Sequence, residues 1–579
     1  MKTGIIALLL NLVSLYLHFT GNFLQPTPDA NLATLTWFLS LILFGIAIFL
    51  LPFKSVKQKH EPLNGKEKLL FFLLLLLGLA LRLYKIKHQG IYLDEWYWVT
   101  NAKSILDGTI QTPFGFIGDQ PSNMPAYIVA LFYSLTHDVY LAVRLPGVLF
   151  SIGTMCFVFL FLKEAYNKKA ALLSTLLLAT SIWDIHMSQL GWNNVSLNPF
   201  LISGTLYFLY RSIKNGSLRD AFLCGIFLGI SINLLYIATL SVLVVAVFWL
   251  YRMIFLVNRK VFVLPLIIFS ITTFMTMSPT IAKIVRYPEQ SIKRHQEFLQ
   301  QNENYSKQSS GMFYYVDQIK LAASDLQYNQ DKYNIVMLWG ITIEPIILLF
   351  FLLGVLYMLR HIKYFPNSIV LLDYIVMLIP IVVLYRFTSI WREYGFVPSL
   401  YIIASLGAYI FLQAVIKVIH FISKHETRAA AISFAVIAVL YIAQWTYYFH
   451  NYYLISLKND PVMYETVCKN TTTYIEKNIP QQTTLYFPNE LCTQLITVVL
   501  DEKYHYTTYN TLEDLQNPAS RGHRAIIVFT KNQVGASTNM SSVLGASTSP
   551  DGLASSAITY STYVIKGADD TVGAIIYTQ

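Results

Sequence analysis

Long apolar stretches separated by short polar turns fill the chain up to residue 449. The stretch at residues 69–84 is almost uninterrupted Leu and Phe, and about 20 apolar residues suffice to cross a bilayer. A stretch at residues 4–19 has no small-residue cleavage pattern after it, so we interpret it as a retained helix. The pattern predicts about thirteen transmembrane helices, at residues 4–19, 32–51, 69–84, 140–162, 170–187, 197–210, 221–236, 238–256, 261–277, 335–359, 369–384, 396–416 and 429–449.

The composition is that of a membrane-embedded chain. Of the 579 residues, 55% are hydrophobic and only 13% are charged, whereas soluble domains average about 25% charged residues. The formal net charge is +10, but in such a chain basic residues usually mark cytoplasmic loops. The sequence therefore predicts a polytopic α-helical membrane protein and disfavours a nucleic-acid partner.

Lysine and arginine concentrate in alternate turns between the apolar stretches, which predicts the orientation. Five lysines precede residues 69–84 and place that turn in the cytoplasm. Every later basic turn falls on the same side if a short apolar stretch ending at Leu135 does not span the membrane. We therefore expect an integral plasma-membrane protein with a cytoplasmic N-terminus and an extracytoplasmic C-terminus. The five lysines are Lys54, Lys57, Lys59, Lys66 and Lys68, and the later basic turns include Lys163 and Lys168, Arg211 and Lys214, Arg252 and Lys260, Arg360 and Lys363, and Lys417 and Lys424.

Two long polar segments interrupt or follow the apolar pattern. Residues 280–333 are long enough to fold over the outer membrane face as a lid or an acceptor-binding loop. From Asn451 the composition becomes that of a soluble domain. We predict three regions: two additional N-terminal helices with a basic cytoplasmic loop at 1–67, a transmembrane catalytic domain at 68–449, and a small extracytoplasmic α/β domain at 450–579.

Within the predicted C-terminal domain, periodicity indicates a helix at 464–477 and strands at 484–487 and 525–529. Residues 535–556 are rich in Ser, Gly and Ala and indicate a flexible loop. Cys468 and Cys492 either form a disulfide, if this region faces an oxidising compartment, or are two free thiols.

Two adjacent carboxylates, Asp94 and Glu95, follow the stretch at 69–84 among tyrosines and tryptophans that favour the headgroup region. Arg82 just before them is expected to extend toward the headgroups. Asp94 is placed to cap a short interfacial helix that ends at Gly108. Neighbouring helix positions do not face each other, so one acid would do chemistry while the other holds structure. A purely structural interpretation, in which Asp94 caps the helix and Glu95 suits its dipole, stays open at this point.

Several motifs occur in order on this one topology. They are the acidic pair Asp94-Glu95, a Pro-containing entry to a short helix at 119–127, Arg144-Leu145-Pro146, the outward helix end at 183–189, and Arg392-Glu393-Tyr394-Gly395 before a Pro-bearing stretch. Over residues 68–419 the chain thereby resembles the GT-C superfamily of lipid-linked-sugar glycosyltransferases, in the branch of protein O-mannosyltransferases and lipid A aminoarabinose transferases. It departs from that pattern where Asp119 replaces the usual His, where Gln189 replaces an Arg, and near Tyr236, where a common Lys is absent.

The resemblance implies the GT-C fold and an inverting transfer of a sugar from a polyprenyl-phosphate donor to an extracytoplasmic hydroxyl of a protein, lipid or glycan. Asp94 and Glu95 are the expected catalytic pair, with Asp94 as the base that takes the acceptor's proton. Charge developing on the leaving phosphate calls for cationic donors. A divalent cation is used in some GT-C branches, and no metal ligand is assigned here. The expected phosphate ligands are Arg392, His186 and Arg144, and the expected substrate contacts are Asp119, Asn123 and Tyr394.

Each accessory residue also has a structural interpretation. His186 suits a satisfied interfacial histidine, and Asp184 suits an ordinary interfacial acid, which is the interpretation we favour for it. Arg144 would extend to the interface, Arg392 would contact anionic lipids, and Asp119 would end a turn.

Three other functions compete with sugar transfer. A transporter or lipid flippase would carry ionisable residues or Gly and Pro breaks at mid-membrane, whereas the acids here concentrate at the outer edge. A non-catalytic scaffold does not account for the ordered motifs. A GT-C relative that transfers preassembled oligosaccharide would need a wider groove.

Overall fold

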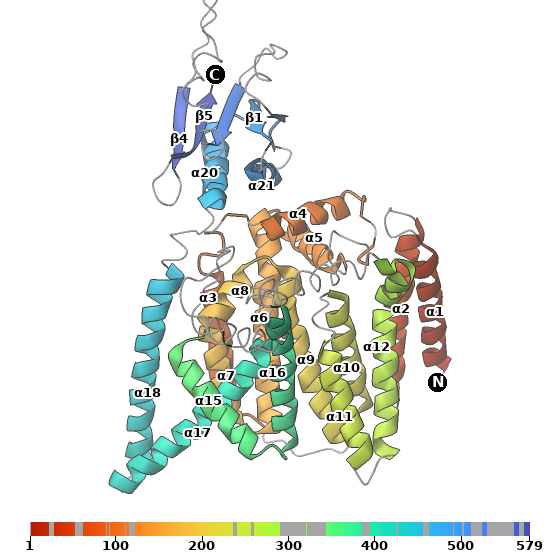
Figure 1. The fold of residues 1–579 in the computed structure, drawn as a ribbon, viewed down its shortest axis with the longest axis vertical. Helices are drawn as coiled ribbons and strands as arrows, with labels where there is room; N and C mark the ends of the chain where they lie inside the picture. The colour runs from red at the N-terminus through yellow and green to blue at the C-terminus, as the bar shows by residue number, and fades with distance from the viewer. Residues whose placement is uncertain are drawn as a thin grey trace, which may run out of the picture.

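The computed structural model of the protein is a bundle of long helices that carries a small sheet-containing unit at one end (Figure 1). The N-terminus lies beside α1 in the bundle, and the C-terminus lies in the sheet unit (Figure 1). The structure describes residues 2–21, 28–51, 62–88, 90–91, 93–110, 112–114, 122–234, 240–255, 260–289, 320, 343–384, 394–423, 426–454, 463–489, 491–500, 503–510, 524–529, 561–566 and 572–578.

Each predicted apolar stretch coincides with helix in the described residues. By length and composition, five of the described helices are able to cross a membrane, or six if the pair α7 and α8, bent by 58°, is one broken span. The count of about thirteen spans stays a prediction. The bundle helices are α1 Lys2–Thr20, α2 Pro28–Leu50, α3 Gly65–Leu83, α6 Val139–Ala165, α7 Lys168–Thr180, α8 Ile182–Gln189, α9 Asn193–Asn215, α10 Leu218–Leu234, α11 Ser241–Phe255, α12 Lys260–Arg286, α15 Pro345–Arg360, α16 Phe365–Leu384, α17 Val397–Ser423 and α18 Glu426–Tyr448.

Polar side chains define where several of these helices begin. Asn64 and Glu67 form a capping box at the start of α3, because each side chain accepts from the other residue's backbone N–H. Asp138 caps α6 by accepting from Leu141 N at 2.9 Å. At the other end, Gly216 stops α9 in the left-handed region with φ of 62°.

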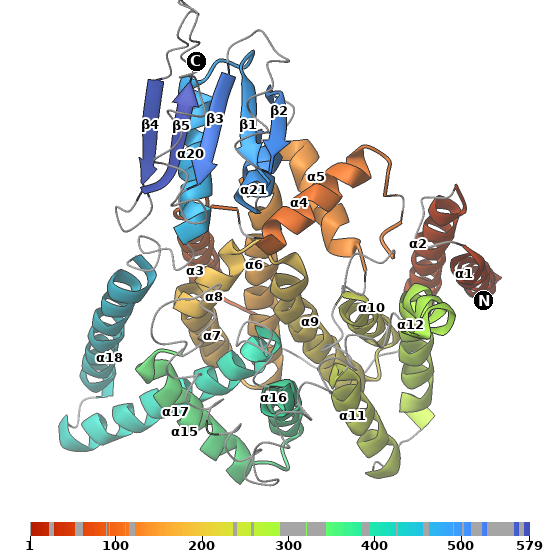
Figure 2. The ribbon, with the colours of Figure 1, turned by 45° about the horizontal axis from the view of Figure 1, so that its top comes forward.

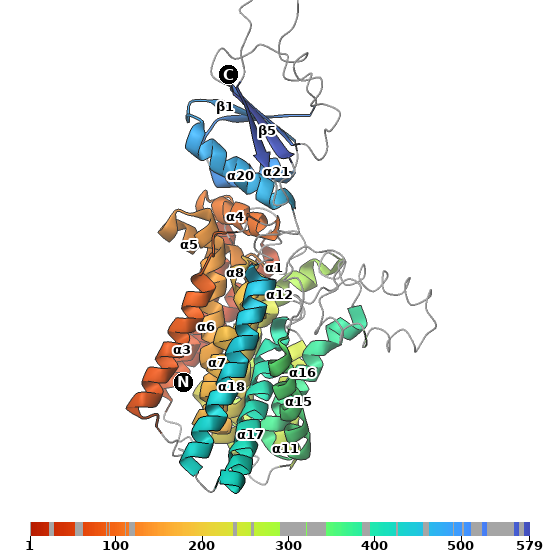
Figure 3. The ribbon, with the colours of Figure 1, turned by 90° about the vertical axis from the view of Figure 1, so that its left-hand side faces the viewer.

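The basic turns lie together at one end of the bundle. The turns between α6 and α7, α9 and α10, α15 and α16, and α17 and α18 all lie at the end opposite the sheet unit (Figure 1, Figure 3). An ion pair between Lys168 Nζ and Glu67 Oε1, 3.0 Å apart, joins the starts of α7 and α3 at this end. The arrangement agrees with the alternation of basic turns in the sequence, and the orientation in a membrane stays a prediction.

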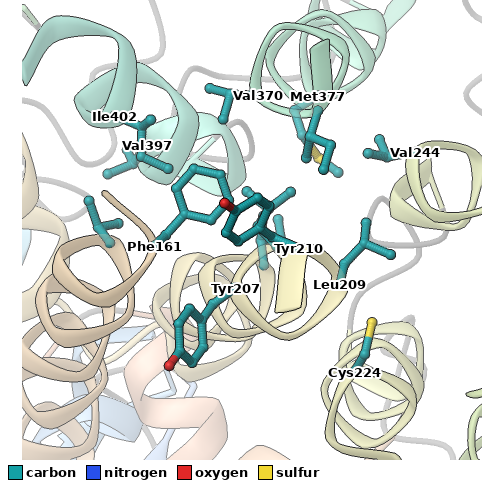
Figure 4. Close-up of a cluster of buried hydrophobic side chains, with 14 of the residues drawn as sticks. Phe161, Tyr207, Leu209, Tyr210, Cys224, Val244, Val370, Met377, Val397 and Ile402 are labelled. Atoms are coloured by element: carbon teal, nitrogen blue, oxygen red, sulfur yellow. The ribbon is translucent and has the colours of Figure 1, made fainter. Parts of the chain in front are cut away.

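A large apolar core holds the bundle together. In Figure 4, Phe161 of α6, Tyr210 of α9, Val244 of α11 and Met377 of α16 lie in one cluster. Glycines let α15 and α17 approach closely, since a Cβ at Gly407 would lie only 1.8 Å from Phe350 O. Small residues at such a crossing are typical of helix packing in membranes.

Two helices lie across the end of the bundle beneath the sheet unit, α4 Leu93–Leu106 and α5 Met124–Thr136 (Figure 2). The predicted short helices therefore both form. Gly108, with φ of 76°, follows the end of α4 as expected. The predicted cap is wrong in one detail: α4 begins at Leu93, so Asp94 lies in its first turn rather than before it.

The C-terminal part is an α/β unit, as predicted. Its five strands are ordered β2-β1-β3-β5-β4; β1 is parallel to β2 and β3, while β5 is antiparallel to β3 and β4. The predicted helix and two strands form, and the loop predicted at 535–556 lies outside the described residues. After the short π-helix η4 Phe449–Leu454, the unit comprises α20 Met463–Asn478, β1 Thr484–Pro488, α21 Leu491–Leu500, β2 Tyr506–Tyr509, β3 Arg524–Phe529, β4 Ser561–Lys566 and β5 Val572–Thr578.

A disulfide joins Cys468 of α20 to Cys492 of α21, with Cα atoms 5.4 Å apart. The sequence left open whether these cysteines form a disulfide or are free thiols, and in the structure they form the disulfide. Cys156 and Cys224 are free thiols in the bundle.

Candidate active site at the sheet-unit end of the bundle

Glu95 anchors the first turn of α4 to the bundle. Its carboxylate accepts two hydrogen bonds from Arg144 of α6, at 2.6 Å from Nε and 2.8 Å from Nη2. Gly191 N, in the turn between α8 and α9, donates to the same carboxylate at 2.9 Å. Both charged side chains are buried, with residue exposures of 0% and 2%. A buried bidentate pair of this kind fixes the position of α4 relative to α6. Neither charged group is exposed to water, so breaking the pair would leave each charge buried without compensation.

Close packing around the pair leaves room only for glycine at position 191. A Cβ there would lie 2.5 Å from Val143 Cγ2 and 2.9 Å from Glu95 Cγ. The α8–α9 turn therefore approaches the carboxylate closely enough to donate its backbone N–H. A larger residue would push the turn away from α4.

The remaining donors of Arg144 hold the segment that leads into α4. Its Nη1 donates to Ile86 O at 2.7 Å, and its Nη2 donates to Gly90 O at 2.6 Å. The side chain does not extend to the interface, so that interpretation of Arg144 is wrong. These contacts describe a residue that positions α4, and its predicted contact with a donor phosphate stays a prediction.

Asp94 lies next to Glu95 but is exposed. The two acids differ in burial because successive helix positions point in different directions. The sequence suggested that one acid holds structure while the other does chemistry, and in the structure one acid is buried and the other is exposed. Glu95 has the contacts of the structural member, and the catalytic assignment of either acid remains a prediction.

A second buried ion pair was missed from the sequence. Arg82 of α3 is fully buried rather than extended toward headgroups. Its Nη2 pairs with Asp184 of α8, and its Nε donates to Ser151 Oγ at 2.8 Å. Ser151 in turn donates to the Asp184 carboxylate at 2.8 Å. Asp184 is therefore not an interfacial acid but the centre of a network that joins α3, α6 and α8.

Tyr394 is a member of the same network. Its hydroxyl donates to Asp184 Oδ1, and its ring lies edge-on to Trp183 with centroids 5.8 Å apart. Tyr394 is 1% exposed. Its predicted contact with substrate is untested, and its observed contact ties the residues just before α17 to α8.

The break between α7 and α8 is held by polar groups from distant helices. Glu344, before α15, accepts from Ile182 N at 3.0 Å, and Thr180 O accepts from Trp445 Nε1 at 2.7 Å. Glu344 is 3% exposed, and its second oxygen is among the described buried atoms without a hydrogen-bond partner. The sequence contained a signal for Glu344, because an ionisable residue inside a predicted transmembrane stretch is costly and usually has a structural or functional partner.

Several buried amides lie at the start of α5 and α9. Asn123 donates to Thr112 O at 3.3 Å, and its side-chain oxygen has no partner among the residues that the structure describes. Within the same described part of the chain, neither amide atom of Asn198, on α9, has a partner, although the residue is only 3% exposed. A Cβ added at Gly395 would lie 2.7 Å from Asn198 Nδ2. Asn198 was not singled out from the sequence, since an asparagine in an apolar stretch has no spacing motif.

The other predicted residues fall in different places. His186 is 4% exposed on α8 and does not lie at the surface. Arg392 and Asp119 lie outside the described residues, as do residues 290–319 and 321–333 of the predicted outer segment. The first residues of that segment, 280–286, continue helix α12. Burial raises the pKa of Tyr127 on α5 to about 12, so its phenol keeps its proton and donates to Ile110 O at 3.4 Å.

Within the part of the chain that the structure describes, no group of three His, Cys, Asp or Glu side chains is arranged to hold a metal ion. We assign no metal ligand.

Comparisons with known proteins agree with this fold. Residues 119–281 match the profile of the family described as dolichyl-phosphate-mannose-protein mannosyltransferase. No curated protein sequence matches the chain. The crystal structure of ArnT from Cupriavidus metallidurans bound to undecaprenyl phosphate is similar to it, with a TM-score of 0.52 and 12% identity over 89% of this chain and 98% of that one.

Two further solved structures are similar. The apo state of the same ArnT has a TM-score of 0.51 and 11% identity, over 89% of this chain and 98% of that one. The oligosaccharyltransferase AglB from Archaeoglobus fulgidus, in complex with an inhibitory peptide and a dolichol-phosphate, has a TM-score of 0.47 and 12% identity, over 80% of this chain and 69% of that one. The ArnT structures share the fold of this chain, which is the GT-C fold that the order of its motifs predicted, and residues 119–281 match the mannosyltransferase family profile.

Proposed function

We propose that the protein is an inverting glycosyltransferase that moves a sugar from a polyprenyl-phosphate donor to an extracytoplasmic hydroxyl acceptor on a protein, lipid or glycan. The observation that carries the proposal is the pairing of an exposed Asp94 with a buried Glu95 on one turn of α4. The buried acid fixes the turn, and the exposed acid is accessible at the end of the bundle that carries the sheet unit. The family match and the undecaprenyl phosphate in the ArnT crystal support a lipid-phosphate donor.

The chemistry requires a base at this position. The acceptor oxygen attacks the anomeric carbon while its proton passes to the Asp94 carboxylate, and the bond from that carbon to the phosphate oxygen breaks. The electron pair leaves on the phosphate, which departs as polyprenyl phosphate. Base assistance of this kind contributes about 10²- to 10⁴-fold to the rate. One displacement inverts the anomeric centre, and no sugar–enzyme bond forms.

The leaving phosphate needs positive charge. Arg392 and His186 are our candidates, since a guanidinium or imidazolium donates to phosphate oxygens with charge-assisted hydrogen bonds. Tyr394, two residues after Arg392, is tied to the buried Asp184. That tie fixes Tyr394, at which the described chain resumes. Arg144 would act through α4 and not through the phosphate, given the bonds it already makes.

The sugar needs groups that both donate and accept. The side-chain oxygen of Asn123 and both amide atoms of Asn198 are buried and have no hydrogen-bond partner among the described residues. Buried polar groups are usually paired, and each unpaired one costs about 1–3 kcal/mol. A sugar hydroxyl donates and accepts at once, so it satisfies an amide better than a phosphate, which only accepts. We therefore assign these two amides, with Asp119, to the sugar ring of the donor.

Two observations support an extracytoplasmic site. The disulfide between Cys468 and Cys492 suits an oxidising compartment, and the sheet unit that contains it lies at the same end as α4 (Figure 1). The basic turns lie at the opposite end, as expected for cytoplasmic loops.

The test is the Asp94→Asn variant. Purified protein in lipid nanodiscs is incubated with undecaprenyl-phosphate-linked mannose, glucose or 4-amino-4-deoxyarabinose and a membrane extract as the acceptor source, and release of free undecaprenyl phosphate is scored. We expect Asp94→Asn to abolish release while undecaprenyl phosphate still binds. Asp107→Asn, which changes an exposed acid just after the same helix, is the matched control and should retain full turnover.

Turnover by Asp94→Asn at the native rate would remove Asp94 as the base. Movement of undecaprenyl phosphate between leaflets without any release of sugar would favour the flippase function instead.

A further inference from the structure

The sheet unit shares one apolar core with α4. Trp98 and Val99 of α4 are 2% and 1% exposed, although α4 lies at the end of the bundle. They belong to a cluster that continues into the sheet unit, where it includes Leu495 and Ile496 of α21. Helix α21 contacts α4 directly (Figure 2). The helix that carries Asp94 is therefore packed between the bundle and the C-terminal unit.

A lysine from the sheet unit holds the segment that precedes α4. Lys469 Nζ of α20 donates to Lys87 O at 2.7 Å and also to His88 O. Arg144 of the bundle donates to the carbonyls of Ile86 and Gly90, on either side of these two. Carbonyls along this short segment are thus held from both sides, from the bundle and from the C-terminal unit.

A second lysine holds the last turn of α4. Lys103 Nζ donates to Val498 O of α21 at 3.0 Å, and it lies over the ring of Tyr133 at 5.7 Å. The direction of donation is opposite to that at Lys469, because here α4 provides the lysine. The two contacts lie at opposite ends of α4, one before its first residue and one in its last turn.

The two contacts belong to one crosslinked helix pair. Lys469 directly follows Cys468 on α20, and Val498 lies on α21 with Cys492. The disulfide between these cysteines prevents α20 and α21 from separating. A shift of the α20–α21 pair would therefore act on both ends of α4 at once.

We propose that the C-terminal unit is a clamp that positions the catalytic helix: Lys469 and Lys103 are positioning residues, and the disulfide holds their two attachment points together. The inference rests on the proposed function, in which Asp94 of α4 is the base. Rates of transfer depend steeply on placement, since an error of about 1 Å costs on the order of 100-fold. Loosening the clamp should therefore lower kcat while the donor site in the bundle stays intact.

The test compares Lys469→Met, Lys103→Met and the double variant with Lys469→Arg. Methionine keeps an unbranched apolar stem but removes the donor, whereas arginine keeps donors within reach of both carbonyls. Lys503→Met is the matched control, because Lys503 is an exposed lysine of the same unit whose ammonium lies 3.5 Å from the Glu476 carboxylate. Full-length protein in nanodiscs is used for hydrogen–deuterium exchange over Leu93–Leu106, with exchange over Arg524–Phe529 as the check that the sheet unit stays folded.

In the double variant we expect faster exchange over Leu93–Leu106 with unchanged exchange over Arg524–Phe529. For the undecaprenyl-phosphate sugar that the native protein uses, we expect kcat to fall about 10- to 100-fold and the donor KM to change less than about twofold. Lys469→Arg should recover most of kcat, and Lys503→Met should match the native protein. Cys468→Ala/Cys492→Ala should change exchange and kcat in the same direction as the double lysine variant.

Native exchange over Leu93–Leu106 in the double lysine variant would overturn the clamp, whatever the turnover. Because exchange needs no substrate, it separates this inference from the proposed function. A native protein that releases no undecaprenyl phosphate from any donor would defeat the proposed function and leave the exchange result standing. A raised donor KM with native kcat would also overturn the clamp, since it would place the lysines in substrate binding.

Discussion

Arg82 of α3 and Asp184 of α8 form an ion pair whose side chains are 0% and 1% exposed. The pair lies 102 residues apart in sequence, and it brings Ser151 and Tyr394 into contact with one carboxylate. Four segments of the bundle therefore meet at Asp184.

Removing one partner of this pair should be more damaging than removing both. Arg82→Leu and Asp184→Leu each leave an uncompensated buried charge, and we expect each to cost about 3–5 kcal/mol of stability. The double variant Arg82→Leu/Asp184→Leu should recover a large part of that loss. Thermal unfolding of the single and double variants in nanodiscs measures the coupling. If the loss of stability in the double variant equals the sum of the losses in the two single variants, the two charges are not coupled.

Replacing Arg144 by lysine distinguishes a positioning role from binding of the donor phosphate. A lysine cannot reproduce the two parallel bonds to Glu95 together with those to Ile86 O and Gly90 O. We expect Arg144→Lys to lower the unfolding temperature and kcat, with little change in the affinity for undecaprenyl phosphate. The measurements are thermal unfolding and binding of undecaprenyl phosphate. If Arg144→Lys instead keeps native stability and binds undecaprenyl phosphate more weakly, the result would support Arg144 as a ligand of the donor phosphate.

Asn198→Leu tests whether the buried amide serves the substrate. Leucine has a similar shape, and it removes polar atoms that have no partner among the described residues, so stability should hold or rise. If the amide meets a sugar hydroxyl, kcat/KM should fall about 10- to 100-fold. Asn215→Leu is the control, because Asn215 also has a buried oxygen without a partner and lies about 25 Å along the same helix. Native kcat/KM in Asn198→Leu would remove this residue from the site.

Labelling of single introduced cysteines tests the orientation. A membrane-impermeant maleimide applied to intact cells should label Asp107→Cys, beyond α4, and should leave Lys363→Cys, in the turn between α15 and α16, unlabelled until the cells are opened. Both positions are exposed, so access depends only on the side of the membrane. The reverse pattern would place Asp94 in the cytosol and contradict an extracytoplasmic transfer.

Local patterns were enough to predict most of the helices. The apolar stretch at 69–84 became α3, the short stretch after Met124 became α5, and Gly108 follows the end of α4 as expected. These features depend on periodicity and on the conformational preferences of single residues, which act over a few neighbours. The same holds for β1 and β3, whereas β2, β4 and β5 were not predicted, because short strands acquire their stability from partners elsewhere in the sheet.

The acidic pair shows where local reasoning stopped. Its residues indicated that Asp94 and Glu95 would differ in role, because neighbours on a helix diverge. They did not indicate that Glu95 would meet Arg144 and Gly191, or that the sheet unit would hold α4 through Lys469. Those partners are 49, 96 and 382 residues away from the groups they contact.

The amino-acid sequence by itself determined that this is a polytopic membrane protein with alternating basic turns, an interfacial acidic helix and the ordered motifs of the GT-C superfamily. Only the tertiary structure decided that Arg82, Arg144 and Asp184 are buried rather than interfacial, and that the C-terminal unit packs on α4. The physical reason is that a charged side chain near the end of an apolar helix is equally compatible with the headgroups and with a buried partner. Which of the two it takes depends on what distant segments place beside it.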